Sequence, residues 1–165
     1  MVRAVLLVCT GNICRSPTAE GVFRKLLCES ALDELVQVES AGTHGYHVGE
    51  APDTRAQEHA QRRGYDLSGL RARQIEQGDF ERFDLILAMD RGHLGILQRL
   101  APPQYRHKLR LFMEFAEGWN LAEVPDPYYG GDAGFEHVLD MIEAGSRGVL
   151  AAVRATLKAS SPRAR

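Results

Sequence analysis

The chain has 165 residues, of which 44% are hydrophobic and 25% are charged, and its formal net charge is −2. This balance indicates one soluble globular domain and excludes a strongly basic nucleic-acid surface or a polybasic membrane anchor. The longest apolar run near the start, AVLLV, is too short for a signal sequence or a membrane span, so we expect a cytoplasmic protein. The three cysteines are an odd number, which favours catalytic or redox-active thiols over structural disulfides.

Strands and helices are predicted to alternate from the first residues onward. Residues 2–8, VRAVLLV, are short and apolar, which is typical of a buried parallel strand. Ser16 and Pro17 indicate a helix start, with the serine hydroxyl as N-cap and proline at the first helical position. The next strand is predicted at residues 35–40, so the chain opens with a strand–helix–strand unit.

The same alternation continues to the end of the chain. It predicts a helix at residues 53–64, a strand at 83–90 and a short helix that ends at Leu100. A strand at 107–112 and a long amphipathic helix at about 133–157 follow. Gly145 and Gly148 should weaken the last helix by up to about 1 kcal/mol each. We therefore expect a three-layer α/β sandwich with a central four-stranded parallel sheet, as one domain over residues 1–158 with a frayed tail over 159–165.

The stretch VCTGNICRSP follows the first strand, at the edge where ligands bind in such sheets. Gly11 and Asn12 can adopt positive φ angles, so the loop can curl with its amides pointing inward. Amides at a helix N-terminus bind oxyanions, and the planar guanidinium of Arg15 can hold two oxygens at once. Cys9 would lie at the floor of this anion-binding cradle.

The same surroundings should favour the thiolate of Cys9. Lowering its pKa by about three units from about 8.5 would raise the reactive fraction roughly thirtyfold. The larger benefit would be stabilisation of a transferring phosphoryl group, whose charge lies on oxygens that the loop holds. Cys9 alone would suggest an ordinary buried cysteine before a turn, but its spacing to Arg15 and the helix start argue against that. A nucleotide P-loop is excluded because no Gly-Lys-Ser/Thr follows, and a zinc site lacks a second cysteine pair.

A phosphate monoester also needs a proton donor for its leaving group. The segment EVPDPYYGGDAGF supplies Asp126, which lies between Pro125 and Pro127. A carboxylic acid there could protonate a departing phenolate, whose conjugate acid has a pKa near 10. Taken alone, Asp-Pro is a common turn sequence.

Together these motifs resemble the low-molecular-weight protein tyrosine phosphatases. The resemblance covers nearly the whole chain and rests on the motifs CTGNICRS, ESAGT, HVGE with DTRA, DLS with RARQI, FDLILAMD and DPYYGG. It implies the phosphatase I-like fold, which is similar to Rossmann and flavodoxin folds. It also implies hydrolysis of phosphotyrosine and small aryl phosphates without metal or organic cofactor.

The resemblance implies a role for each catalytic residue. Cys9 would be the nucleophile that forms a cysteinyl-phosphate, and Arg15 would clamp the phosphoryl oxygens. Asp126 would protonate the leaving phenol and then activate the water that hydrolyses the intermediate. Ser16 would hydrogen-bond the sulfur and stabilise it as the leaving group of that second step.

The remaining site residues are also implied by the resemblance. Asn12, assisted by Ser40, would hold the strained loop, whose other members are Thr10, Gly11, Ile13 and Cys14. Aromatic walls around the substrate ring would be formed by Tyr46, Tyr128 and Tyr129. Tyr46 stands where many bacterial members have tryptophan. Leu70 stands where many have a histidine that tethers the loop asparagine, so we expect a somewhat looser loop.

The other two cysteines are open to different interpretations. Cys14 is either a half-buried filler or the partner of a reversible disulfide with Cys9, which would protect Cys9 from over-oxidation. The resemblance favours the second interpretation. Cys28, on the first predicted helix, is expected to be a buried filler.

Three other functions compete with phosphotyrosine hydrolysis. Arsenate reductases share the cradle but need later resolving cysteines, and none follows Cys28. Protein-arginine phosphatases are closer, but the resemblance suggests a threonine where this chain has the apolar Ile13. A non-catalytic phosphate-binding module would need neither Cys9 nor Asp126.

We expect a phosphotyrosine-containing protein as substrate, with a tyrosine kinase as one candidate. We expect the protein itself to be a monomer or weak homodimer that binds neither nucleic acid nor membrane.

Overall fold

The computed structural model describes residues 1–161, and the side chain of Tyr129 lies outside this description. The described residues form one parallel sheet in the strand order β2-β1-β3-β4. The strands are β1 (Ala4–Cys9), β2 (Gln37–Gly42), β3 (Leu85–Ala88) and β4 (Leu109–Leu111). None of the helices in this part of the chain has the length and apolar character needed to cross a bilayer.

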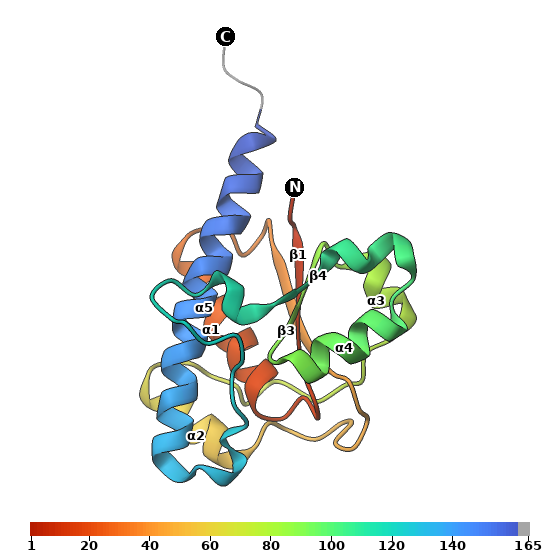
Figure 1. Ribbon diagram of the computed structural model, residues 1–165. Coiled ribbons are helices and arrows are strands. Elements are labelled where there is room, and N and C mark those ends of the chain that lie inside the picture. The colour runs from red at the N-terminus through yellow and green to blue at the C-terminus, as the bar shows by residue number, and fades with distance from the viewer. Residues whose placement is uncertain (162–165) are drawn as a thin grey trace.

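Helices cover both faces of the sheet, so the predicted three-layer sandwich is confirmed (Figure 1). One side carries α1 (Arg15–Glu29), α2 (Thr54–Arg62) and the long α5 (Gly131–Ala159). The other side carries α3 (Gln77–Arg82) and α4 (Arg91–Leu100). Three short 3₁₀ helices complete the described elements: η1 (Pro103–Lys108), η2 (Phe112–Phe115) and η3 (Pro127–Tyr129).

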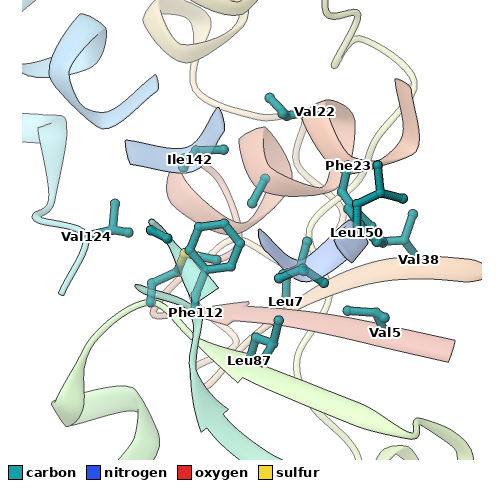
Figure 2. Packing of buried hydrophobic residues seen from close by; sticks show 14 of the residues in the cluster. Val5, Leu7, Val22, Phe23, Val38, Leu87, Phe112, Val124, Ile142 and Leu150 are labelled. Atoms are coloured by element: carbon teal, nitrogen blue, oxygen red, sulfur yellow. The ribbon is translucent and has the colours of Figure 1, made fainter. Parts of the chain in front are cut away.

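Side chains of the central strands alternate between two hydrophobic clusters. Val5, Leu7 and Cys9 belong to the cluster on the α1 and α5 side, part of which Figure 2 shows. Leu6 and Val8 belong to the cluster on the α3 and α4 side. Because both faces of β1 are buried, its sequence is apolar throughout rather than alternating, as the parallel-strand prediction assumed.

The predicted elements are correct in type, but several boundaries differ. The first strand continues to Cys9, so the thiol lies at the strand end rather than within the loop. The first helix begins at Arg15 with Cys14 as N-cap, so the prediction that Ser16 is the N-cap is wrong. The Ser16 hydroxyl instead bonds side chains of the loop. The helix α3 was not predicted because six residues are too few to show helical periodicity.

Two glycines allow the long helix α5 to pack closely against η2. A Cβ atom on Gly145 would overlap the ring of Phe112, and one on Gly148 would overlap the backbone of Phe115. Each glycine is predicted to lower the stability of the helix, but each also allows a close packing contact that a larger residue would prevent. The helix runs to Ala159, and residues 162–165 of the predicted tail lie outside the described residues.

Candidate active site

The predicted anion-binding loop follows β1, where successive strands are added first on one side of β1 and then on the other. The chain passes from β1 outward to β2 and then returns to β3 on the other side of β1, which opens a crevice at the carboxyl ends of β1 and β3. A pocket of about 280 Å³ lies there. It is lined by Cys9, Thr10, Gly11, Ile13, Cys14, Arg15, Tyr46, His47, Asp126 and Tyr128. The predicted nucleophile, guanidinium and acid therefore share one pocket.

The loop between β1 and α1 is strained at one residue. Asn12 has a φ angle of 58°, as predicted, and its side chain is 2% exposed. Gly11 does not have a positive φ, so that part of the prediction is wrong. A Cβ atom at position 11 would lie 2.9 Å from Cδ2 of His47, so a larger residue there would require the His47 ring to shift. A non-glycine residue in the left-handed region persists only where its surroundings fix it.

Hydrogen bonds on all sides fix the Asn12 side chain. Its Oδ1 accepts from the main-chain N–H of Arg73 at 3.0 Å, which determines how the amide is oriented because that partner can only donate. Its Nδ2 then donates to the hydroxyls of Ser16, at 2.8 Å, and Ser40, at 2.9 Å. The main chain at Arg73 thus supplies a tether in this chain, and the looser loop expected from Leu70 finds no support in these contacts.

This arrangement fixes Ser40 as a donor and leaves the Ser16 proton free to bond the Cys9 sulfur. Ser40 accepts from Asn12 and donates to the carboxylate of Glu20 at 2.7 Å. Ser16 accepts from Asn12, so its own proton is available for the Cys9 sulfur 2.9 Å away. Burial raises the pKa of Glu20, although Ser40 and Arg24 act in the opposite direction. The buried chain of bonds therefore ends with a hydroxyl beside the predicted nucleophile, and this hydroxyl donates to the sulfur when Cys9 is a thiolate.

Arg15 is held by groups from two other parts of the chain. Its Nη1 donates to Asp90 Oδ2 at 2.9 Å and to the carbonyl oxygen of Val124 at 3.1 Å. Burial opposes the charge on Asp90, but hydrogen bonds from the His93 amide and from Arg15 outweigh it and lower the pKa of the carboxyl. Asp90 is therefore an anion that fixes the buried guanidinium.

The segment that carries Asp126 is anchored on both sides. Before it, the Val124 amide donates to the carbonyl of Met89 at 2.8 Å. After it, Arg55 of α2 donates to the carbonyl of Tyr128 at 3.3 Å and lies 5.0 Å from the ring centre of Tyr128. Asp126 accepts from the Tyr128 amide at 3.0 Å, and its side chain is otherwise on the exposed side of the pocket. The acid is thus placed at the pocket by contacts on either side.

The pocket rim is aromatic and open to solvent. Tyr46 is 72% exposed and Tyr128 is 50% exposed, although both line the pocket. His44 stacks on Tyr46 with ring centroids 5.0 Å apart. The predicted rim residues Tyr46 and Tyr128 therefore meet at the pocket, whereas the side chain of Tyr129 lies outside the described part of the structure.

Comparisons with known proteins agree with this geometry. The family profile described as low molecular weight phosphotyrosine protein phosphatase matches residues 4–159. The chain belongs to this family. A low molecular weight protein-tyrosine-phosphatase of Streptomyces coelicolor is 49% identical over 158 residues, which span 93% of this chain and 95% of that protein. The human low molecular weight phosphotyrosine protein phosphatase is 44% identical over 138 residues, or 82% and 86% of the two chains.

Solved structures of other phosphatases also share the fold of this family member. A protein tyrosine phosphatase from Entamoeba histolytica superposes with a TM-score of 0.90 at 37% identity, covering 93% of this chain and 98% of that one. YfkJ from Bacillus subtilis superposes with a TM-score of 0.88 at 38% identity, covering 94% and 97%. The expected phosphatase fold is therefore confirmed.

Three residues of this phosphatase-family site were not predicted from the sequence. His47 lines the pocket and is bonded to Glu50 at 2.7 Å. Asp90 and His93 lie at the start of α4 and contact the pocket residues Arg15 and Thr10. Asp90 could have been found, because it ends the stretch FDLILAMD and so follows a strand at the same sheet edge as Cys9.

The two additional cysteines of this family member differ in burial. Cys14 is buried, and burial, followed by nearby Asp53, raises the pKa of its thiol to about 12. Cys28 is exposed, so its expected role as a buried filler is wrong. It lies one residue beyond the buried Leu27, and a step of one residue turns the side chain away from the buried helix face.

We expect the Asp90→Asn variant to lose about ten- to hundredfold in kcat/KM for p-nitrophenyl phosphate. This range corresponds to one charge-assisted hydrogen bond that no longer fixes Arg15. The matched control is Glu114→Gln, which removes the exposed ion pair with Arg110 and should leave the kinetics unchanged. Equal kcat/KM for Asp90→Asn and the unmodified enzyme would show that Asp90 does not position Arg15.

Stability should fall in mild acid because of His93. Burial, and then the charge of Arg15, lower the pKa of this imidazole to about 4, against an ordinary value of about 6.5. Between these pH values the unfolded chain binds a proton that the folded chain does not, so stability is lost as the pH falls from 6.5 toward 4. Urea midpoints at pH 7 and pH 4.5 should therefore differ less for His93→Gln than for the natural sequence. Identical differences would contradict this assignment.

Proposed function

We propose that this chain hydrolyses phosphotyrosine in proteins, and small aryl phosphates, through a cysteinyl-phosphate on Cys9. The observation that carries the proposal is that Cys9, Arg15 and Asp126 line one pocket, with the buried Ser16 hydroxyl oxygen 2.9 Å from the Cys9 sulfur. Phosphate binding alone would need neither a sulfur with its own donor nor an acid at the rim.

In the first step, the Cys9 thiolate attacks phosphorus and the bond from phosphorus to the phenol oxygen breaks. Asp126 donates its proton to that oxygen, so a neutral phenol leaves. Among the described residues, both bonds that Arg15 donates use Nη1. The other edge of the guanidinium, with Nε and Nη2, is left to hold two phosphoryl oxygens as charge spreads over them.

In the second step, the Asp126 carboxylate takes a proton from water while the water oxygen attacks phosphorus. The phosphorus–sulfur bond breaks, and the electron pair returns to Cys9 as thiolate. The hydrogen bond from Ser16 stabilises this leaving sulfur, and inorganic phosphate departs. Each group returns to its starting protonation state, so no cofactor is consumed.

The pocket walls favour an aryl substrate. Tyr46 and Tyr128 form the rim, and Ile13 adds an apolar side chain without a hydroxyl. These side chains can pack on a phenyl ring. Ile13 offers no hydroxyl to a phosphoguanidine, which would be the substrate group of the competing arginine-phosphatase function.

A comparison of two peptides tests this preference. We expect kcat/KM for a phosphotyrosine peptide to exceed that for a matched phosphoarginine peptide by at least about tenfold, and Ile13→Thr to narrow the ratio. The control peptide carries phosphoserine, whose alkoxide is a poorer leaving group. A reversed ratio would assign the chain to arginine phosphatases, and loss of all three activities would leave phosphate binding alone.

The cellular substrate is proposed to be a phosphoprotein, and a tyrosine kinase is one candidate. The enzyme is proposed to act in the cytoplasm as a monomer or weak dimer. A substrate-trapping variant at Cys9 or Asp126 would capture this substrate from a lysate.

Cys14 lines the same pocket as Cys9, which supports the proposal of a reversible disulfide between them under peroxide. If Cys14→Ser recovers activity with thiol as fully as the natural enzyme, this redox role fails.

A further inference from the structure

One buried imidazole beneath the pocket has no role in the steps above. His93 is 4% exposed and lies in the first turn of α4. Its Nε2 lies 2.7 Å from Thr10 Oγ1, in the phosphate-binding loop. Its Nδ1 lies 3.1 Å from Asp90 Oδ1 but makes no aligned hydrogen bond, and it is one of two buried side-chain atoms among the described residues without such a bond.

The surroundings determine which ring nitrogen carries the proton. Nδ1 faces a carboxylate oxygen, which would repel a lone pair, so the hydrogen belongs on Nδ1. Nε2 then carries the lone pair and accepts the hydroxyl proton of Thr10. The charged and titratable groups around the ring are Asp90, Arg15, Asp126 and His44. Burial, Arg15 and His44 lower the pKa of the imidazole and outweigh Asp90 and Asp126, which raise it, so the ring is neutral at pH 7.

Two parts of the phosphate site meet at this ring. On one side, Thr10 directly follows Cys9, and its carbonyl accepts from the amide of His44 at 3.0 Å. Because side chains alternate along an extended chain, Cys9 faces the α1 side whereas Thr10 faces α4. On the other side, Asp90 holds Arg15. The imidazole therefore lies between the loop and the carboxylate that fixes the guanidinium.

We propose that His93 is a positioning residue, which fixes Thr10 and hence the first peptide of the phosphate loop relative to the Asp90–Arg15 pair. The proposal rests on the function proposed above for this site. It does not place His93 in contact with substrate. Its effect is on phosphate affinity and on transition-state stabilisation, since both depend on the relative placement of loop amides and guanidinium.

Substitutions that preserve the position of only one ring nitrogen separate the contact with Thr10 from the contact with Asp90. In His93→Gln the amide oxygen can reach the position of Nε2 and accept from Thr10, whereas His93→Asn reaches only the position of Nδ1. Thr10→Val removes the hydroxyl at nearly constant volume. We expect His93→Asn and Thr10→Val each to raise the inhibition constant of inorganic phosphate, and to lower kcat/KM for p-nitrophenyl phosphate, by about five- to tenfold. His93→Gln should stay within about twofold of the natural enzyme.

The double variant Thr10→Val with His93→Asn decides whether the two residues act through each other. We expect its losses to equal those of either single variant, because the same hydrogen bond is removed once. Multiplicative losses would overturn the proposal. So would His93→Asn with unchanged kinetics and a lowered Tm, which is the behaviour expected of Leu97→Val, a stability control in the same helix.

The outcome for the natural enzyme separates this inference from the proposed function. If the natural enzyme neither binds inorganic phosphate in calorimetry nor turns over p-nitrophenyl phosphate, the proposed function itself fails. If it does both, and His93→Asn and Thr10→Val match it in both, only the role of His93 fails.

Discussion

The Cys9→Ser variant is expected to lose aryl phosphatase activity by about four orders of magnitude or more, while it still binds inorganic phosphate. A serine hydroxyl is a far weaker nucleophile than a thiolate, and the Ser16 donor that suits a sulfur anion at 2.9 Å does not ionise an alcohol. Arg15 and the loop remain in place, so affinity for phosphate should change little. Steady-state kinetics with p-nitrophenyl phosphate and calorimetry with phosphate measure the two quantities separately.

The control for this experiment is Cys28→Ser, which changes the exposed thiol and should leave kcat and KM unchanged. Rapid acid quenching of the natural enzyme with labelled substrate should capture phosphorus on Cys9, and peptide mapping identifies the residue. Phosphorus on another residue, or substantial turnover by Cys9→Ser, would exclude the cysteinyl-phosphate pathway.

The second large effect is expected for Asp126→Asn. This substitution keeps the shape of the side chain and its acceptor for the Tyr128 amide but removes the transferable proton. Turnover of phenyl phosphate should fall by about two orders of magnitude or more, in the range typical of general acid catalysis. The loss should become smaller as the pKa of the leaving phenol decreases, because a better leaving group needs less protonation.

A series of substituted phenyl phosphates tests this dependence, and Glu117→Gln, an exposed acid earlier in the same part of the chain, serves as control. Losses of equal size across the series would mean that Asp126 does not protonate the leaving group. If Glu117→Gln showed the same dependence, the effect would reflect the charge of the region rather than one acid.

Local sequence patterns predicted the framework of the fold well. The apolar runs at residues 2–8 and 83–90 are buried strands because both faces of a parallel sheet are covered. The proposed phosphate-binding loop could be predicted because its residues are contiguous, from Cys9 to Ser16. Asp126 was predicted because prolines mark its turn and because the proposed chemistry requires an acid, and the structure places it at the same pocket.

Features that depend on contacts between distant segments were missed. Asp90 contacts Arg15 across 75 positions and His93 contacts Thr10 across 83. The strand before Asp90 indicates its sheet edge, but no local spacing indicates which residues these two side chains contact. The role of Gly11 was misassigned because the residue it closely approaches, His47, lies on another loop. The N-cap at Ser16 failed because its hydroxyl is taken by Asn12 and Cys9, a tertiary demand that overrides a local preference.

Val124 gives the acid-bearing segment a fixed pivot. Its amide donates to the carbonyl of Met89, directly after β3, and its carbonyl accepts from Arg15. One residue therefore links the start of the acid-bearing segment to the guanidinium and fixes both to the sheet. The proposed anion-binding half of the site is thus preorganised, and we expect little reorganisation when a phosphate binds.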